Sequence, residues 1–184
     1  VGSARTDPYV ASSAAAAALS GRFRSNGMNA ILRMLDDIGS PAGVQAFVDK
    51  VKDERAEPAG FGHRLYRSYD PRARILRLEA ERLFDVVERP EIFDIALRLD
   101  DVASRDPYFV DRGLFPIVDF YEAVMYVAMG FPEDMFPVLF AIPRFVGWTA
   151  QWEEMISEPE QQTYRPQQIY IGRSERAYQP IDER

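Results

Sequence analysis

The sequence of 184 residues contains no cysteine and a single histidine, His63. The lack of cysteine excludes disulfide bonds, thiol nucleophiles and cysteine-based metal sites. A lone histidine argues against zinc, because zinc sites usually recruit several His or Cys ligands. Lysine is also scarce, with only Lys50 and Lys52. Arginine therefore carries almost all of the positive charge, and its guanidinium can bind carboxylates and phosphates with two parallel hydrogen bonds.

Long apolar runs are missing as well. The longest, residues 136–142, is far shorter than the ~20 residues that a helix needs to cross a bilayer. The alanine-rich residues 11–19 follow no basic segment, so they do not predict a signal peptide. The formal net charge is −7 and no basic run exists, which argues against nucleic acid as a partner. The composition predicts a globular cytoplasmic protein without bound metal, membrane or nucleic acid.

Most of the chain has helical periodicity, and the predicted fold class is all-α. Ile31, Met34, Leu35 and Ile38, for example, recur at the spacing of one helix face. Asp-Pro pairs are typical of helix starts. Aromatic residues cluster late in the chain, which predicts the best-packed region there. Helices are expected after Asp7-Pro8, over residues 31–38, from Pro41, from Pro71, after Pro90, over residues 119–129 and over residues 132–157, where Pro143 should kink or divide the last one.

The surroundings of His63 are unusual. It lies in the segment GFGHRLYRSYDPRARIL, residues 60–76, between glycines that allow close backbone approach to a ligand. Five arginines follow by residue 77, and Asp70-Pro71 starts a helix among them. Arginines and helix N-termini both attract anions. Taken alone, however, a single histidine is more often structural or exposed than catalytic. The residues by themselves favour a phosphate or carboxylate site and a solvated basic helix face equally.

This segment resembles the signature of citrate synthases, and further segments resemble the same family in order. LFPIVDFYEAV, residues 114–124, resembles the part that carries the family's catalytic aspartate, which falls on Asp119. PRFVGWTAQWEEM (143–155) resembles a late helix, RPQQIYIG (165–172) the C-terminal arm, and VGSARTDPY (1–9) a helix start. The resemblance covers nearly the whole chain and corresponds to the C-terminal half or so of a full-length enzyme. It is strongest to bacterial, cyanobacterial-type members.

The resemblance implies condensation of acetyl-CoA with oxaloacetate to give citrate and CoA, a step of the tricarboxylic acid cycle. CoA would be a co-substrate, with no tightly bound cofactor, and the protein would be a homodimer. The implied domain organisation has three parts. Residues 1–24 would be a helix of the large domain, residues 25–131 the small helical domain, and residues 132–184 a C-terminal helix and extended arm of the large domain.

The resemblance also implies roles for single residues. Asp119 would remove a proton from the acetyl group, and His63 would polarise the oxaloacetate carbonyl. Arg72, Arg144 and Arg165 would bind the substrate carboxylates, Arg165 across a dimer interface. CoA would contact Arg67 and Arg74 through its phosphates, and Gly60 and Gly62 near its adenine. The alternatives are structural: Asp119 as a helix cap, Arg144 as a surface residue beside a kink, Arg165 as a loop residue, and Phe145, Trp148 and Trp152 as core aromatics.

The sequence departs from the family pattern at important positions. Arg24 stands where the family has its enol-stabilising histidine, and Ile117 where asparagine is usual. The family's earlier oxaloacetate-binding histidine would lie before Val1. A lost acid or base typically costs about 10²–10⁴ in rate, so we expect this chain alone to be inactive. The alternative is a non-catalytic structural module that still binds CoA or a dicarboxylate. An active enzyme that uses Arg24 is the least favoured hypothesis.

Overall fold

The computed structural model describes residues 1–21 and 27–183, and it confirms the all-α prediction. Within these ranges the only extended pairing is an isolated antiparallel bridge between Phe61 and Pro116. The α-helices are α1 (Pro8–Leu19), α3 (Gly27–Ile38), α4 (Val44–Glu54), α5 (Pro71–Leu83), α6 (Glu91–Ala103), α7 (Pro107–Arg112), α8 (Val118–Ala128) and α9 (Phe136–Ser157), with 3₁₀ turns at Gly2–Ala4, Pro41–Gly43, Glu133–Met135 and Ile181–Glu183.

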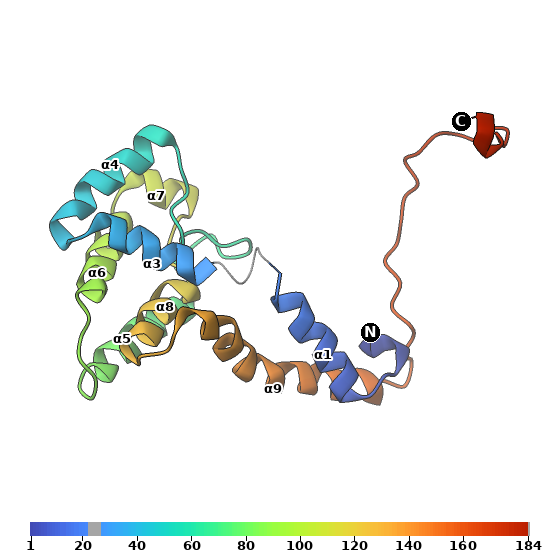
Figure 1. Ribbon diagram of the computed structural model, residues 1–184, viewed down its shortest axis with the longest axis horizontal. Helices are drawn as coiled ribbons and strands as arrows, with labels where there is room; N and C mark the ends of the chain where they lie inside the picture. The colour runs from blue at the N-terminus through green and yellow to red at the C-terminus, as the bar shows by residue number, and fades with distance from the viewer. Residues whose placement is uncertain (22–26, 184) are drawn as a thin grey trace.

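The helices form two parts that differ in packing (Figure 1). Helices α3 to α8 form a compact body, in which α8 packs against α3 and α5 and α6 packs against α4. Helix α9 leaves this body and runs beside α1. The fully buried side chains of the core include Phe93, Leu99, Phe120 and Tyr121. The best-packed region is therefore this body, whose largest fully buried side chains are aromatics between Phe93 and Phe136, while the later aromatics of α9 and the tail lie outside the core.

Aspartates cap three of the helices in the same way. Asp7, Asp70 and Asp106 each precede a proline, and each side chain accepts a hydrogen bond from a backbone N–H two residues on. The sequence analysis predicted the first two helix starts. It did not predict the third, at Asp106, which begins α7. Pro143 does not divide α9, which continues through it to Ser157.

The turn before His63 is joined to the start of α8 through the backbone. Gly62 N donates to Phe115 O at 2.9 Å, and Ile117 N donates to Gly60 O at 2.9 Å. Between these bonds Phe61 is buried, with its ring edge-on to that of Phe120 at 5.1 Å between centroids. This pairing brings residues 60–62 and 115–117, which are far apart in the sequence, side by side.

Gly60→Ala tests how tightly this pairing is built. Gly60 has a left-handed φ of +78°, and a Cβ there would lie 2.8 Å from Ile31 Cδ1. The left-handed conformation alone costs about 1–2 kcal/mol for a residue with a Cβ. We therefore expect a loss of about 2 kcal/mol in the free energy of unfolding, measured by urea denaturation. Gly147→Ala is the control, because Gly147 lies in α9 with open space around it; equal stability of the two variants would contradict the interpretation.

The two ends of the helical part are tied together by hydrogen bonds that we call the terminal clasp. Trp152 Nε1 donates to Thr6 O at 2.9 Å, Arg5 Nε donates to Gln161 Oε1 at 2.7 Å, and Tyr164 N donates to Ser3 Oγ at 3.0 Å. Beyond the clasp the tail extends away from the body, as Figure 1 shows. Residues 168–171, where the sequence alternates, are exposed and form no strand.

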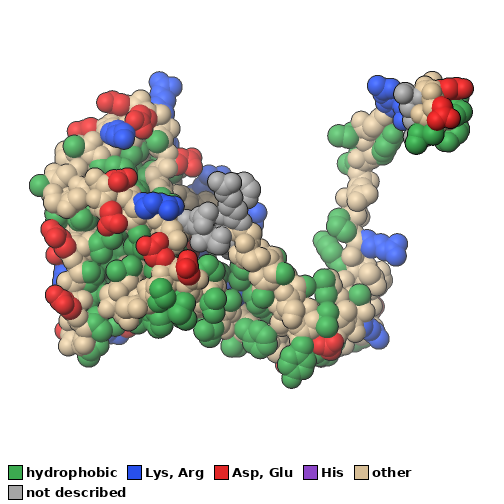
Figure 2. Space-filling model, in the orientation of Figure 1, with side chains coloured by type: hydrophobic (Ala, Val, Ile, Leu, Met, Phe, Trp, Pro, Cys, Tyr) green, Lys and Arg blue, Asp and Glu red, His purple; other side chains and the backbone are tan. Residues whose placement is uncertain are grey.

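An apolar groove of about 450 Å³ lies between α1 and α9. Hydrophobic side chains gather along this side of the molecule (Figure 2). Phe145 is 46% exposed, so its assignment as a core aromatic is wrong, while Trp148 and Trp152 are half-buried. In the parts of the chain that the structure describes, no helix is long and apolar enough to cross a bilayer.

Candidate functional site

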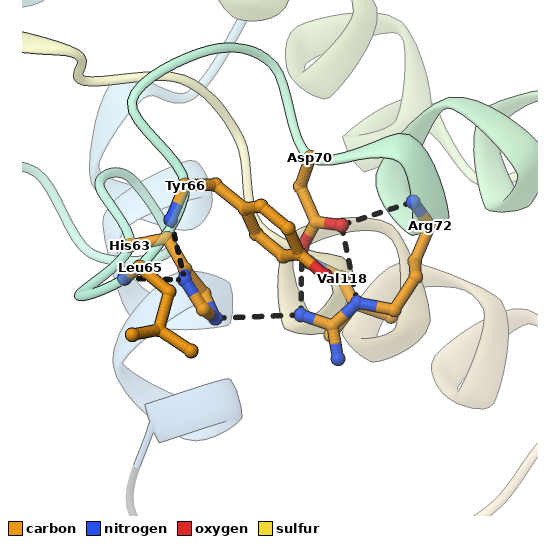
Figure 3. A network of polar contacts seen from close by, with 6 residues as sticks. All are labelled: His63, Leu65, Tyr66, Asp70, Arg72 and Val118. Atoms are coloured by element: carbon orange, nitrogen blue, oxygen red, sulfur yellow. Dashed lines mark hydrogen bonds and ion pairs between the residues drawn. The ribbon is translucent and has the colours of Figure 1, made fainter.

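His63 is held in one orientation by the loop that follows it. Its Nδ1 accepts hydrogen bonds from the backbone N–H groups of Leu65 (3.0 Å) and Tyr66 (3.1 Å), as Figure 3 shows. Because Nδ1 is an acceptor, the neutral ring carries its proton on Nε2. Nε2 faces Arg72 Nη2 at 3.5 Å. With the proton on Nε2 neither nitrogen can accept a hydrogen bond from the other, so a carbonyl or carboxylate oxygen that both could contact would suit this position.

Tyr66 packs against both of these donors. Its ring lies 4.5 Å from the His63 ring, centroid to centroid, at an interplanar angle of 34°. The Arg72 guanidinium carbon lies 5.6 Å from the centre of the same ring. An aromatic face near a guanidinium is attractive and restricts its rotation. Tyr66 therefore helps to fix the direction in which the His63 and Arg72 donors point.

Asp70 anchors Arg72 and links it to α8. Its Oδ1 accepts from Arg72 N (2.9 Å) and Nε (3.1 Å), and its Oδ2 accepts from Arg72 Nη2 (2.9 Å) and Val118 N (3.2 Å). Burial by itself would raise the pKa of Asp70, but the Arg72 side-chain and backbone hydrogen bonds outweigh it and hold that pKa below its usual range. The Asp70 side chain is 1% exposed and the Arg72 side chain 41% exposed. One edge of the Arg72 guanidinium is thus held by Asp70, and the other edge is exposed.

Asp119 lies in the first turn of α8, one residue after Val118. The N-cap position belongs to Ile117, so the alternative that Asp119 is the cap of this helix is wrong. A Cβ on Gly27 would lie 3.9 Å from Asp119 Oδ2, which places the start of α3 close to this carboxylate. The Asp70 hydrogen bond comes first among the causes that raise the pKa of Arg72, and the charge of Asp119 adds to them. His63, Arg72 and Asp119 are therefore gathered at one place.

The other predicted binding residues lie on α9, on α5, in the loop before α5 and in the tail. Arg144 projects from α9, with its guanidinium carbon 4.9 Å from the centre of the Phe140 ring. Arg74 on α5 is exposed and lies 5.5 Å from the centre of the Tyr69 ring. Arg67 is exposed in the loop before α5. Arg165 lies in the tail beyond α9, apart from the compact body (Figure 1). Arg24 lies outside the described residues.

Glu122 is a site residue that the sequence reasoning missed. It follows Asp119 by three positions on α8, and its Oε1 accepts a hydrogen bond from the Tyr126 hydroxyl at 2.6 Å. Its Oε2 is buried without a hydrogen-bond partner. Burial raises the pKa of Glu122, and the negative charge of Asp119 raises it further. The helical spacing from Asp119 was the available signal, since residues three apart share a face.

Acidic and histidine side chains do not assemble into a metal site in residues 1–21 and 27–183: no group of three or more could hold an ion. The chemistry that the described residues offer is instead the binding of an oxygen anion by two fixed N–H donors. A carboxylate that can accept a proton, Asp119, stands beside them. This combination suits proton removal next to a bound carbonyl or carboxylate compound.

Comparison with known proteins places the chain in a family. The family model described as "Citrate synthase, C-terminal domain" matches residues 1–167. A citrate synthase of Dictyostelium discoideum is 44% identical over 184 residues, 100% of this chain and 36% of that protein. A peroxisomal citrate synthase of the same organism is 46% identical over 184 residues, again 100% of this chain and 37% of its own length. A glyoxysomal citrate synthase of Cucurbita maxima is 43% identical over 182 residues, 99% of this chain and 35% of its own.

Solved structures give the same result. Citrate synthase of Thermoplasma acidophilum, in a ternary complex with carboxymethyl coenzyme A and oxaloacetate, matches 99% of this chain and 48% of its own with a TM-score of 0.81 at 35% identity. The Thermotoga maritima enzyme matches 100% of this chain and 49% of its own with a TM-score of 0.78 at 35% identity. The chain thus spans little more than a third of the curated relatives and about half of these structures.

One expectation changes with these comparisons. The predicted cytoplasmic location is contradicted, because relatives that match the whole or nearly the whole chain are named peroxisomal and glyoxysomal enzymes. The composition carries no signal for such a location. The particular likeness to bacterial, cyanobacterial-type members stays a prediction, because the matching proteins come from Dictyostelium and Cucurbita as well as from Thermotoga maritima. The resemblance itself is confirmed over residues 1–167, and the protein belongs to the citrate synthase family.

Proposed function

We propose that the chain carries part of a citrate synthase active site, in which oxaloacetate is bound by His63 and Arg72 next to Asp119. The observation that carries this proposal is that His63 Nε2 and Arg72 Nη2 lie 3.5 Å apart, with Nδ1 of His63 held as an acceptor by the backbone. The Thermoplasma acidophilum relative, which holds oxaloacetate and a CoA derivative, supports the choice of substrates. Arg144, on α9, would meet a second carboxylate of the same substrate.

The geometry suggests how these groups would act. Asp119 would accept a proton from the methyl carbon of acetyl-CoA, and that carbon would then form a bond to the ketone carbon of oxaloacetate. The ketone oxygen gains negative charge in this step. The His63 Nε2–H and the Arg72 guanidinium would stabilise that charge, as fixed donors do in many active sites. That oxygen would take up a proton to become a hydroxyl, and a water molecule would then attack the thioester carbonyl and break its C–S bond, giving citrate and the free thiol of CoA.

CoA would reach this site as a co-substrate. Arg67 and Arg74 are exposed and could pair with its phosphates. Gly60 and Gly62 would lie near its adenine, although the side of each glycine that lacks a Cβ packs against Ile31 and Leu114, respectively. Arg165 belongs to the tail, which extends away from the compact body (Figure 1), and it would serve the site of a second chain in a homodimer. The proposed division is residues 1–24 and 132–184 for the large domain and 25–131 for the small one. The names of two relatives favour a location in a microbody. The proposed role is a step of the tricarboxylic acid cycle.

We infer that this chain alone binds anions but does not turn over. Arg24 replaces the family's histidine, and the chain covers 36% of a related enzyme. The second candidate function is therefore a non-catalytic module that binds CoA or a dicarboxylate. The intact Asp70–Arg72 pair favours retained anion binding, because it keeps the guanidinium oriented.

The test combines turnover and binding. Mixed with acetyl-CoA and oxaloacetate, the pure chain should release no thiol above background, while a full-length family member does. Calorimetry should detect oxaloacetate binding, weakened about 10–100-fold in Arg72→Ala, the size expected for hydrogen bonds to a charged group. Arg82→Ala is the control, because Arg82 is exposed and pairs only with Glu79 among the described residues.

Each result bears on a different part of the proposal. Turnover that disappears in Asp119→Ala would overturn the inferred inactivity and leave the site assignment standing. Binding of neither oxaloacetate nor CoA would overturn the anion site and leave only a folded scaffold.

A further inference from the structure

Glu122 is only partly satisfied by its neighbours. The Tyr126 hydroxyl donates to Oε1 at 2.6 Å, but Oε2 is buried and has no hydrogen-bond partner. A buried carboxylate oxygen without a donor is unfavourable, because it has lost water and gained nothing in exchange. A proton on Oε2 lowers this cost, because a neutral carboxyl group is less costly to bury than a carboxylate. The geometry of Glu122 is therefore that of a carboxyl group poised to take up a proton.

Charged and titratable groups on α8, α9 and α5 change the pKa of Glu122. Burial is the largest cause of its raised pKa, and the charge of Asp119 on α8 adds to it. The Tyr126 hydrogen bond and the positive charges of Arg144 on α9 and Arg72 on α5 act in the opposite direction. The two arginines thus favour the ionised form of Glu122. They are also the two residues of this chain that would bind the carboxylates of the substrate.

We propose that Glu122 couples anion binding to proton uptake: when a dicarboxylate occupies Arg72 and Arg144, Glu122 takes a proton from the solvent onto Oε2. The inference rests on the proposed function in one respect, that these arginines hold the anion. Bound negative charge cancels the positive charge that keeps Glu122 ionised. Because binding and protonation are linked, each must favour the other equally. The anion therefore binds more tightly as the pH falls through the range in which Glu122 titrates.

The first arm of the test needs no ligand. The carboxyl carbon of Glu122 is followed by ¹³C NMR against pH, with its resonance assigned by its loss in Glu122→Gln. Arg144→Gln should raise the midpoint and Asp119→Asn should lower it, each by about 0.3 pH units or more, the size of a charge pair one turn apart on a helix. Glu153→Gln, an exposed position of α9, is the control and should leave the midpoint unchanged. An unchanged midpoint in Arg144→Gln would overturn the proposal.

The second arm uses oxaloacetate as the probe. Calorimetry in two buffers with different ionisation enthalpies gives the number of protons taken up on binding. The wild-type chain should take up a fraction of a proton, and Glu122→Gln should take up none while still binding. Binding without uptake in the wild type would overturn the proposal. An absence of binding, together with the expected shift in Arg144→Gln, would instead reject the proposed anion site and uphold the link between Glu122 and the arginines.

Discussion

Asp100→Ala is expected to lower the free energy of unfolding by about 3–5 kcal/mol, the cost of removing one partner of a buried ion pair. Asp100 lies on α6 and is 0% exposed. It accepts hydrogen bonds from Tyr69 Oη at 2.6 Å, Arg77 Nη1 at 2.8 Å, Ser104 Oγ at 2.9 Å and the Tyr121 hydroxyl. Alanine would leave these donors without an acceptor inside the core.

The position of Asp100 explains why its loss should destabilise several elements of the site. Tyr121 belongs to α8, Arg77 to α5 and Tyr69 to the loop that contains His63, so one carboxylate joins three elements of the site. Burial is the largest cause that raises the pKa of both hydroxyls. The Asp100 hydrogen bond comes next for Tyr69, and the Asp100 charge comes next for Tyr121. Both hydroxyls therefore remain donors at any ordinary pH.

Urea denaturation followed by circular dichroism measures the loss. Asp101→Ala is the matched control, because Asp101 binds the other branch of Arg77 at 3.1 Å but is 41% exposed. Exposed pairs contribute about 0–1 kcal/mol. A loss in Asp100→Ala as small as that in Asp101→Ala would show that the network contributes little to stability.

Asp70→Ala is expected to affect both stability and binding. The helix-cap bond is typically worth about 1 kcal/mol, and hydrogen bonds to a charged group add about 1.5–3 kcal/mol. The free energy of unfolding should therefore fall by about 2–4 kcal/mol. Oxaloacetate binding should weaken too, because Arg72 loses the partner that orients it. Asp7→Ala is the control: Asp7 also caps a helix before a proline, but it is exposed and binds only backbone N–H groups.

The contribution of Asp70 to stability should depend on pH in a definite direction. The pKa of Asp70 is lowered in the folded protein, with burial opposing ionisation and the Arg72 hydrogen bonds outweighing it. Its contribution is therefore fully present above the unfolded value of about 3.9 and is lost as the pH falls through the folded pKa. Urea midpoints at pH 7 and at pH 3 should differ less in Asp70→Ala than in the wild type. Equal differences, or a loss no larger than in Asp7→Ala, would contradict the assigned role.

Local signals in the sequence were enough to predict much of the fold. Asp-Pro pairs and apolar spacing indicated α1, α3, α5 and α8 because capping and amphipathic packing depend on neighbouring residues. The packing of α9 could not be predicted in this way. Its aromatics look like core residues, yet Phe145 lines an exposed groove, because which face is covered depends on the neighbours of the helix.

The candidate site was less accessible to residue patterns. The meeting of His63 and Asp119 depends on backbone bonds between residues 60–62 and 115–117, and backbone pairing has no side-chain signature. It was the resemblance to the family that predicted a common site for His63 and Asp119. Glu122 was missed for a related reason: its importance comes from the burial of Oε2, which only the packing of α8 reveals.

The terminal clasp has a consequence for how the molecule opens. It joins residues about 150 positions apart, such as Thr6 and Trp152. The entropy of closing a loop grows only with the logarithm of its length, so this long connection costs little more than a shorter one. The clasp is held by a few hydrogen bonds and a half-exposed helix pair, whereas the core lies in α3 to α8. We therefore expect the two ends of the helical part to be a unit of local unfolding, which parts and rejoins while the compact body stays folded.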